Sequence, residues 1–243
     1  MRIRCFFVCS FCLTLFSLLG CNGESSKSAD VKQTPSEQTE PGIAGTPEQE
    51  SGSNSTEPVF DTRMLFDGSS LDNWEVTRFG GEGECSLENG EMIVEMGNPM
   101  SGMTCTIEDL PKMNYEISLE AKRVDGIDFF CCLTFPVADS HCSFIVGGWA
   151  GSLVGLSCID GKDASDNETK VLLSFEDDRW YKIRVSVEPE KIRCWIDDEE
   201  VVDFDTSGRK ISLRNETLPS RPLGLGTFQT KAAYRNIELK TGK

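Results

Sequence analysis

Apolar and polar residues alternate strictly along two long stretches of this chain, and this period of two constrains the fold more than any other feature. Residues 115–122 read Tyr-Glu-Ile-Ser-Leu-Glu-Ala-Lys, and residues 181–187 read Tyr-Lys-Ile-Arg-Val-Ser-Val. Successive side chains of an extended chain point to opposite faces, so each stretch is predicted to be a β-strand with one buried face. Turn residues at 188–191 and 197–200 divide residues 180–205 into a three-strand meander.

Shorter apolar runs between turn residues predict further strands. They lie at 91–95, 103–107, 128–135, 141–146, 152–159, 170–175, 210–214, 223–229 and 232–239. The run at 128–135 is apolar at nearly every position, which is typical of a central strand covered on both faces. No stretch has a sustained apolar pattern at helical spacing. About twelve short strands therefore predict an all-β fold, a jelly-roll sandwich of two antiparallel sheets.

The first 21 residues have the pattern of a bacterial lipoprotein export signal. Arg2 and Arg4 precede an apolar run, and residues 18–21, Leu-Leu-Gly-Cys, look like a lipobox, in which cleavage leaves Cys21 carrying lipid. The apolar run is shorter than the ~20 residues that a spanning helix needs, which disfavours an uncleaved anchor. Residues 1–20 are thus predicted to be a signal peptide, and lipid on Cys21 is predicted to be the only membrane attachment.

The residues after Cys21 have the composition of a disordered acidic linker, predicted to cover residues 21–58. Between Asn22 and Pro58 there is no aromatic residue, and seven acidic residues stand against two basic ones. Such a segment cannot bury enough apolar surface to offset the entropy of ordering it. Asn22, and not Asp, follows the lipid-bearing cysteine, which favours delivery to the outer membrane. Residues 59–243 remain for one β-sandwich domain.

Charge and cysteine content exclude some classes of partner and scaffold. Cleavage would remove two of the 24 basic residues and none of the 40 acidic ones, leaving 22 against 40, a formal charge of −18. That charge would repel nucleic acid and anionic lipid headgroups. The domain keeps seven cysteines without regular spacing, so buried reduced thiols are favoured over a disulfide framework.

Two segments near the ends of the domain resemble a known family. Residues 65–74 read LFDGSSLDNW, interpreted as two short strand pieces joined by a tight turn at Asp67-Gly68, and residues 222–240 read PLGLGTFQTKAAYRNIELK. Both resemble the domain of unknown function 1080, also called the 3-keto-disaccharide hydrolase family. The resemblance implies a concanavalin-like sandwich. It also implies cleavage of glycosides whose C3 hydroxyl has been oxidised to a ketone, by elimination and then hydration.

His141 is the only histidine, and it follows Asp139 in the sequence Asp-Ser-His-Cys. It could act as a general base with Asp139 fixing its tautomer, since an unperturbed histidine pKa suits proton transfer at neutral pH. The alternative is a hydrogen-bonded residue at the start of a strand. A zinc site with Cys131, Cys132 and Cys142 is disfavoured, because neighbours on a strand point to opposite faces and no C-x-x-C pair occurs.

A second candidate is the glycine-rich segment that contains Trp149. Gly147 and Gly148 precede it and Gly151 follows, and glycine allows a ligand to approach the backbone closely. A displayed indole is a surface on which a sugar ring can stack. Trp149, Gly147 and Gly148 are therefore candidate substrate-binding residues; the alternative is that Trp149 only closes one end of the sandwich.

The family's chemistry needs a base, a donor to the enolate oxygen and an aromatic platform. The resemblance makes Asp128, Asp139 or His141 the candidate base, and Arg221 or a backbone amide of Gly147–Gly148 the candidate donor. Residues 125–130 and 228–230 depart from the Asn-Ser-Gly and His-Gly that many relatives carry there. A divalent metal is possible, but no spacing predicts one. Three hypotheses stay open: a glycan-cleaving enzyme, a non-catalytic glycan-binding module, and an envelope interaction domain.

Overall fold

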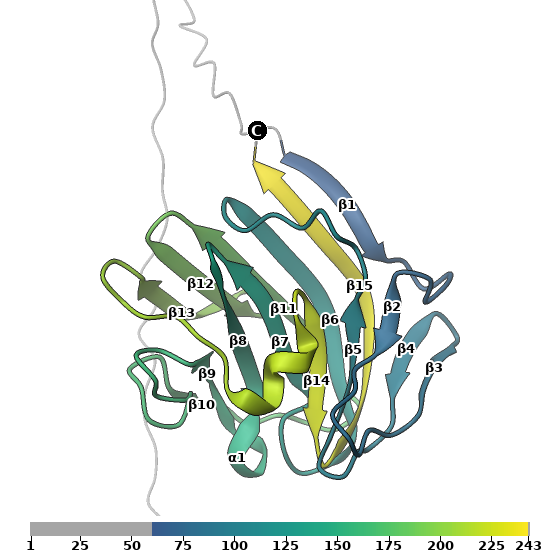
Figure 1. The fold of residues 1–243 in the computed structure, drawn as a ribbon. Helices are drawn as coiled ribbons and strands as arrows, with labels where there is room; N and C mark the ends of the chain where they lie inside the picture. The colour runs from purple at the N-terminus through teal and green to yellow at the C-terminus, as the bar shows by residue number, and fades with distance from the viewer. Residues whose placement is uncertain (1–59, 243) are drawn as a thin grey trace, which may run out of the picture. The chain divides into compact units, whose positions relative to one another are not determined.

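The computed structural model describes residues 60–242, which form fifteen strands in two antiparallel sheets (Figure 1). The predicted signal peptide, the lipid site Cys21 and the linker lie outside the described residues. Sheet A has the order β13-β12-β11-β6-β15-β4-β3, and β1 pairs with the C-terminal part of β15. Its strands are β1 (Phe60–Phe66), β3 (Cys85–Glu88), β4 (Glu91–Val94), β6 (Tyr115–Gly126), β11 (Tyr181–Glu188), β12 (Lys191–Ile196), β13 (Glu199–Asp205) and β15 (Thr230–Gly242).

Sheet B is the second layer and has the order β10-β9-β8-β7-β14-β5-β2. Its strands are β2 (Trp74–Val76), β5 (Met100–Cys105), β7 (Cys131–Val137), β8 (Ser140–Gly147), β9 (Leu153–Ser157), β10 (Val171–Leu172) and β14 (Gly224–Phe228). Two short helical segments, α1 (Gly148–Gly151) and the 3₁₀ segment η1 (Asn215–Ser220), complete residues 60–242. The predicted jelly-roll sandwich is confirmed.

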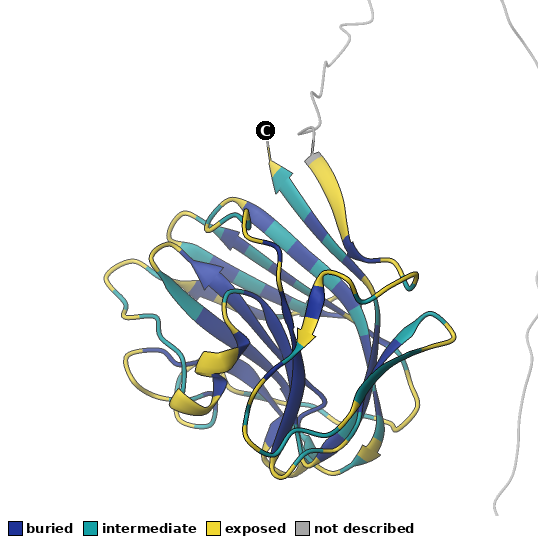
Figure 2. Cartoon of the chain, turned by 45° about the vertical axis from the view of Figure 1, so that its right-hand side comes forward, coloured by how far each residue is buried: buried dark blue, intermediate teal, exposed yellow. Residues whose placement is uncertain are grey.

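The period-two stretches form the core because their apolar sides all face the space between the sheets (Figure 2). On β6 and β11 buried and half-buried residues alternate throughout the predicted stretches, and the buried ones join one cluster with residues of sheet B. Fully burying one such aliphatic or aromatic side chain stabilises the fold by about 1.5–3 kcal/mol. The predicted meander is confirmed as β11, β12 and β13.

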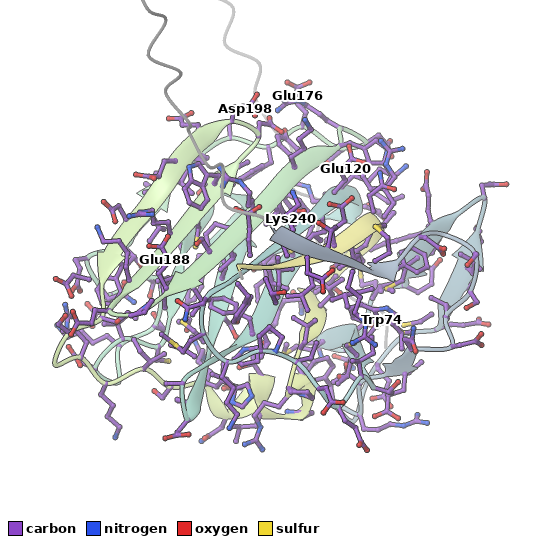
Figure 3. The ribbon with its side chains drawn as sticks, turned by 90° about the horizontal axis from the view of Figure 1, so that it is seen from above. Trp74, Glu120, Glu176, Glu188, Asp198 and Lys240 are labelled. Atoms are coloured by element: carbon purple, nitrogen blue, oxygen red, sulfur yellow. The ribbon has the colours of Figure 1, made fainter. Side chains whose placement is uncertain are left out.

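The outer faces of the two sheets, which point away from the core, differ in chemistry. Sheet A carries ion pairs on its outer face, such as Arg184–Glu116 at 2.9 Å and Arg193–Glu188 at 2.8 Å, and Figure 3 labels Glu188. Sheet B is buried on both faces along β7, as predicted for residues 128–135. Its outer face has a second apolar cluster, separate from the core. Because the outer face of sheet A is charged and that of sheet B is apolar, an apolar binding surface is expected on sheet B.

The segment at 65–74 is not the hairpin that the sequence suggested. β1 belongs to sheet A and β2 belongs to sheet B, where it pairs with β5, so these residues carry the chain from one sheet to the other. The Trp74 indole N–H donates to the Leu65 carbonyl at 3.0 Å and holds the two strands together across the edge. Gly68 has a φ of +85°, and a Cβ there would lie 2.7 Å from the Gly90 carbonyl oxygen. The motif therefore connects the two sheets and anchors their packing at this edge.

Three other strand predictions need correction. The predicted strand at 210–214 makes only an isolated bridge between Ile159 and Ile211, and the chain then enters η1. The predicted strand at 170–175 shortens to β10, and β3 was not predicted. In both overestimated segments the apolar side chains pack against the core, while the backbone is paired over only a few residues.

Cysteines in the described residues are free thiols, and all but Cys85 are buried. This matches the prediction of buried reduced cysteines. Among residues 60–242, no helix has the length and apolar character needed to cross a membrane.

Candidate functional site

A pocket of about 320 Å³ opens on the outer face of sheet B. Its floor is apolar and consists of Met100, Phe129, Ile145 and Phe228. Phe129 and Phe228 pack against each other with ring centroids 5.7 Å apart. A pocket of this size lies at the lower end of the range of about 300–1,000 Å³ that is typical of small-molecule sites.

A row of small residues crosses sheet B beside the pocket. Backbone pairing sets Gly102, Gly226, Cys132, Ile145 and Gly155 side by side across five strands. Of these five residues, Ile145 lines the pocket. Burial raises the pKa of the Cys132 thiol to about 11, so this thiol stays protonated at neutral pH and serves as packing.

One wall of the pocket is the segment α1, at the end of β8 (Figure 1). It is not a regular helix, because Trp149 has a φ of 47° and Ala150 a φ of 67°, and the flanking Gly147 and Gly151 are also left-handed. A left-handed conformation is uncommon for any residue with a side chain and is rarer still for a bulky one. The strained loop displays the Trp149 side chain at the pocket with 40% of its surface exposed.

Asp128 stands beside this loop and is bonded to it. Its Oδ2 accepts the Ala150 N–H at 3.1 Å, and its Oδ1 accepts the Phe129 N–H at 2.8 Å. Its own N–H donates to the buried Thr230 Oγ1 at 3.1 Å, and that hydroxyl donates to the Asp128 carbonyl at 3.2 Å. The structure thus brings together Asp128, Trp149, Gly147 and Gly148, as the sequence led us to expect.

The pocket lining also includes a charged pair that was not predicted. Arg214 and Glu216 lie at the start of η1, with guanidinium and carboxylate atoms 3.4 Å apart, and Arg214 also bonds Asp163 at 2.9 Å. The Glu216 pKa is lowered by its own backbone N–H and by Arg214, so this carboxylate is ionised at neutral pH. The sequence marked 210–214 only as a strand, so nothing in it pointed to this pair.

His141, Asp139 and Arg221 lie at the other end of β7 and β8. His141 pairs with Pro136 near the end of β7 opposite Asp128. Seven residues of β7 at about 3.3 Å each separate the two groups by roughly 20 Å. Burial, and then Arg221 and Lys112, lowers the His141 pKa. The structure therefore does not bring His141 or Arg221 to the pocket.

The predicted pairing of Asp139 with His141 does not form. Asp139 is fully exposed on the turn between the strands, and its ion-pair partner is Lys112, 3.9 Å away. No hydrogen bond between Asp139 and His141 occurs within residues 60–242. A metal site at this end is not formed either, because Cys131 and Cys142 face the core while Cys132 faces outward. Across the described chain, no three His, Cys, Asp or Glu side chains gather to hold a metal ion.

The outer face of this two-sheet jelly roll thus has an apolar pocket with an exposed tryptophan and a few polar groups. The chain belongs to the 3-keto-alpha-glucoside-1,2-lyase-like domain family, which matches residues 61–240. Membership confirms the resemblance given by residues 65–74 and 222–240. It also supports a function that acts on glycans.

Solved structures share the fold at low sequence identity. The Crh5 transglycosylase in complex with NAG aligns with a TM-score of 0.52 at 14% identity, over 75% of this chain and 83% of that chain. Its apo form gives a TM-score of 0.51 at 14% identity, over 75% and 84%. The carbohydrate-binding module CBM66 from Bacillus subtilis gives 0.48 at 12% identity, over 68% and 94%. A comparison with curated protein sequences gave no match.

Proposed function

We propose that this protein binds a glycan oxidised at C3 in the sheet B pocket and cleaves its glycosidic bond by elimination. The observation that carries the proposal is the Arg214–Glu216 pair, which lines the same pocket as Trp149 and an apolar, aromatic floor. The pocket thus has a surface for a sugar ring, an ionised carboxylate and a fixed positive charge. Family membership supports the same chemistry.

Binding would use the two faces of a pyranose differently. The C–H face of the ring stacks on the Trp149 indole, and Phe129 and Phe228 extend the apolar surface below it. The hydroxyl groups at the ring edge meet the polar wall at Arg214 and the Ser157 hydroxyl. The strongly acidic surface does not oppose this ligand, because the sugar is neutral.

The elimination assigns one task to each charged group. The carbonyl at C3 acidifies the C2 proton, and the Glu216 carboxylate removes it. The electron pair passes to the C3 oxygen as an enolate, which the Arg214 guanidinium stabilises. The enolate then collapses to a C1=C2 double bond, the C1–O bond breaks, and the departing oxygen takes the proton. Water adds across C1=C2 in a second step, so the sum is hydrolysis.

Turnover tests the proposal directly. Purified protein is incubated with 3-keto-trehalose or 3-keto-sucrose, and we expect release of the aglycone sugar. Trp149→Ala should lower affinity by about tenfold, given that stacking on an aromatic ring is worth about 0.5–1.5 kcal/mol or more. Trp195→Ala is the matched control, because Trp195 lies on sheet A, outside the pocket. The Arg184 guanidinium carbon covers it, 3.6 Å from the centroid of the Trp195 ring.

The outcomes separate the rival functions. Binding of keto-glycosides or plain glycans without any release would make the domain a glycan-binding module. If the protein neither binds nor cleaves any of these glycans, the remaining hypothesis is an interaction domain of the cell envelope.

We further propose that the protein is a lipoprotein of the cell envelope, held in the outer membrane by lipid on Cys21. The support is the export pattern of residues 1–21. Growth with labelled palmitate should label the wild-type protein in the membrane fraction and leave Cys21→Ala unlabelled. Equal labelling of both proteins would contradict the anchor.

A further inference from the structure

The Trp149 loop is the turn between β8 and β9, and it is held in a costly conformation. Trp149 and Ala150 both have positive φ, and residues held in such regions cost on the order of 1–3 kcal/mol each. The pocket lies on one side of the loop, and on the other side a second hollow of about 330 Å³ is lined by Ile127, Ala150 and Gly151. Backbone pairing closes the base of the turn, where Gly148 pairs with Leu153 and the Ser152 N–H donates to the Gly148 carbonyl at 3.1 Å, but it does not include Trp149 or Ala150.

Asp128 provides the one side-chain hydrogen bond that reaches residues 148–151 in the described structure, from Oδ2 to the Ala150 N–H at 3.1 Å. Asp128 is itself fixed. Its backbone exchanges two hydrogen bonds with Thr230 Oγ1, and Thr230 is fully buried at the start of β15. The loop in sheet B is thereby tied to a strand of sheet A. Hydrogen bonds to a charged group are the stronger kind.

We infer that Asp128 is a positioning residue, which holds the left-handed Trp149 loop so that the indole faces the ligand. This inference rests on the proposed function. It assigns Asp128 a different task from the base role suggested by the sequence. Each carboxylate oxygen already accepts a backbone N–H, and protonation of Oδ2 during turnover would weaken the bond that orders the loop. Glu216 has no such structural duty toward the loop.

Two substitutions separate positioning from proton transfer. Asp128→Ala removes the acceptor, and the affinity for a 3-keto-glycoside should fall by about tenfold or more, the range expected for a hydrogen bond to a charged group. Asp128→Asn keeps one carbonyl oxygen for the Ala150 N–H but is not a base. It should recover most of the affinity and turnover lost in Asp128→Ala. If Asp128 were the base, Asp128→Asn would lose about 10²–10⁴ in turnover.

A readout without ligand tests the order of the loop separately from the proposed function. The protein has four tryptophans, so four indole N–H signals are expected by NMR, and Trp149→Phe assigns one of them. In Asp128→Ala the Trp149 signal should broaden or shift, and hydrogen exchange at the Ala150 amide should rise at least tenfold. Asp128→Asn keeps only a neutral acceptor for the Ala150 N–H, so its exchange at Ala150 should lie between that of Asp128→Ala and that of the wild type.

The results distinguish the two claims. Unchanged exchange and an unchanged indole signal in Asp128→Ala would overturn the positioning role, whatever the protein binds. Loss of Ala150 protection in a protein that binds no glycan at all would uphold the role and overturn the proposed function. A melting temperature measured for each variant shows whether a change is local or reflects loss of the fold.

Discussion

The two ends of the β7–β8 pair differ in what covers the outer face of sheet B. At the Trp149 end the face is open, and an exposed indole stands over an apolar floor. At the His141 end the segment from 209 to 222 crosses the sheet. Ser140 Oγ donates to the Ile211 carbonyl at 2.8 Å, and Cys158 and Ser212 exchange two backbone hydrogen bonds. The Ser140 hydroxyl and the Cys158 and Ser212 backbone groups are thus satisfied inside the protein, so they have less to offer a ligand.

The comparison shows that the ability of a group of side chains to act on a ligand depends on whether other segments cover them, as much as on their residue types. The His141 end has a histidine, a carboxylate and an arginine, which is the richer set on paper. Arg221 and Lys112 act on His141 only by lowering its pKa, and Asp139 points to solvent. The Trp149 end has fewer such residues, but it offers a hollow in which they face one ligand.

The largest effect is expected from Glu216→Gln, which breaks the proposed chemistry at the open end. The variant keeps the side-chain size and an acceptor for Arg214, but it removes the base. Turnover should fall by about 10²–10⁴, with a much smaller change in KM. Because the Glu216 pKa is lowered from 4.5, the wild-type acid limb of kcat assigned to this group should lie below pH 4.5. Steady-state kinetics between about pH 3.5 and pH 8, a range that includes the ordinary Glu pKa of about 4.3, measure both.

Glu188→Gln is the matched control for this variant. Glu188 pairs with Arg193 at 2.8 Å on sheet A, a comparable partly exposed ion pair outside the pocket (Figure 3). It should retain wild-type turnover. Equal losses in the two variants, or full activity in Glu216→Gln, would remove Glu216 from the mechanism.

Gly224→Ala tests how firmly the covered end is closed. A Cβ at Gly224 would lie 2.6 Å from the Ser220 carbonyl oxygen, so η1 would have to move off the sheet. Overpacking of this kind costs about 1–3 kcal/mol, measured as a lower free energy of unfolding in urea.

Gly226→Ala is the matched control, two residues further along β14. A Cβ there has its nearest neighbour at 3.6 Å, the Cys132 Cβ, so the fold has room for it. Its stability should stay within about 1 kcal/mol of the wild type. Equal destabilisation by the two variants would show that η1 is not seated tightly on Gly224.

The sandwich could be predicted because its signal is local. Strict alternation over 115–122 and 181–187 specifies a strand and its buried face without reference to any partner. The sheet to which a strand belongs is a different matter. The segment 65–74 has the composition of a hairpin, yet β1 and β2 pair with β15 and β5, far along the chain.

The site was predictable only in the part that a local pattern marks. Glycines around Trp149 indicated a displayed indole, and Asp128 lay at the start of the apolar run beside it. Arg214 and Glu216 reach the pocket only because η1 folds back over sheet B, and a six-residue 3₁₀ segment has no periodicity to reveal it. His141 was attractive as the only histidine, but residue type carries no information on which end of a strand is covered.

The smallest expected effect is a pH dependence from His141 at the covered end. Burial lowers the His141 pKa below 6.5, so below that pH the unfolded chain binds a proton that the folded protein resists. The stability associated with neutral His141 is therefore complete above pH 6.5 and is lost as the pH falls through the lowered pKa. His141→Gln should remove this slope between pH 7 and pH 5.5, a window set by the ordinary histidine pKa of about 6.5.

Urea unfolding of both proteins at the two pH values measures the slope, and the effect should be small because the side chain is half-exposed to solvent. The absence of any other histidine in the chain makes the difference attributable to this group. Turnover should not change, since roughly 20 Å separates His141 from the pocket. A loss of turnover in folded His141→Gln would indicate that the general base is His141. The active site would then lie at the covered end and not at the Trp149 end.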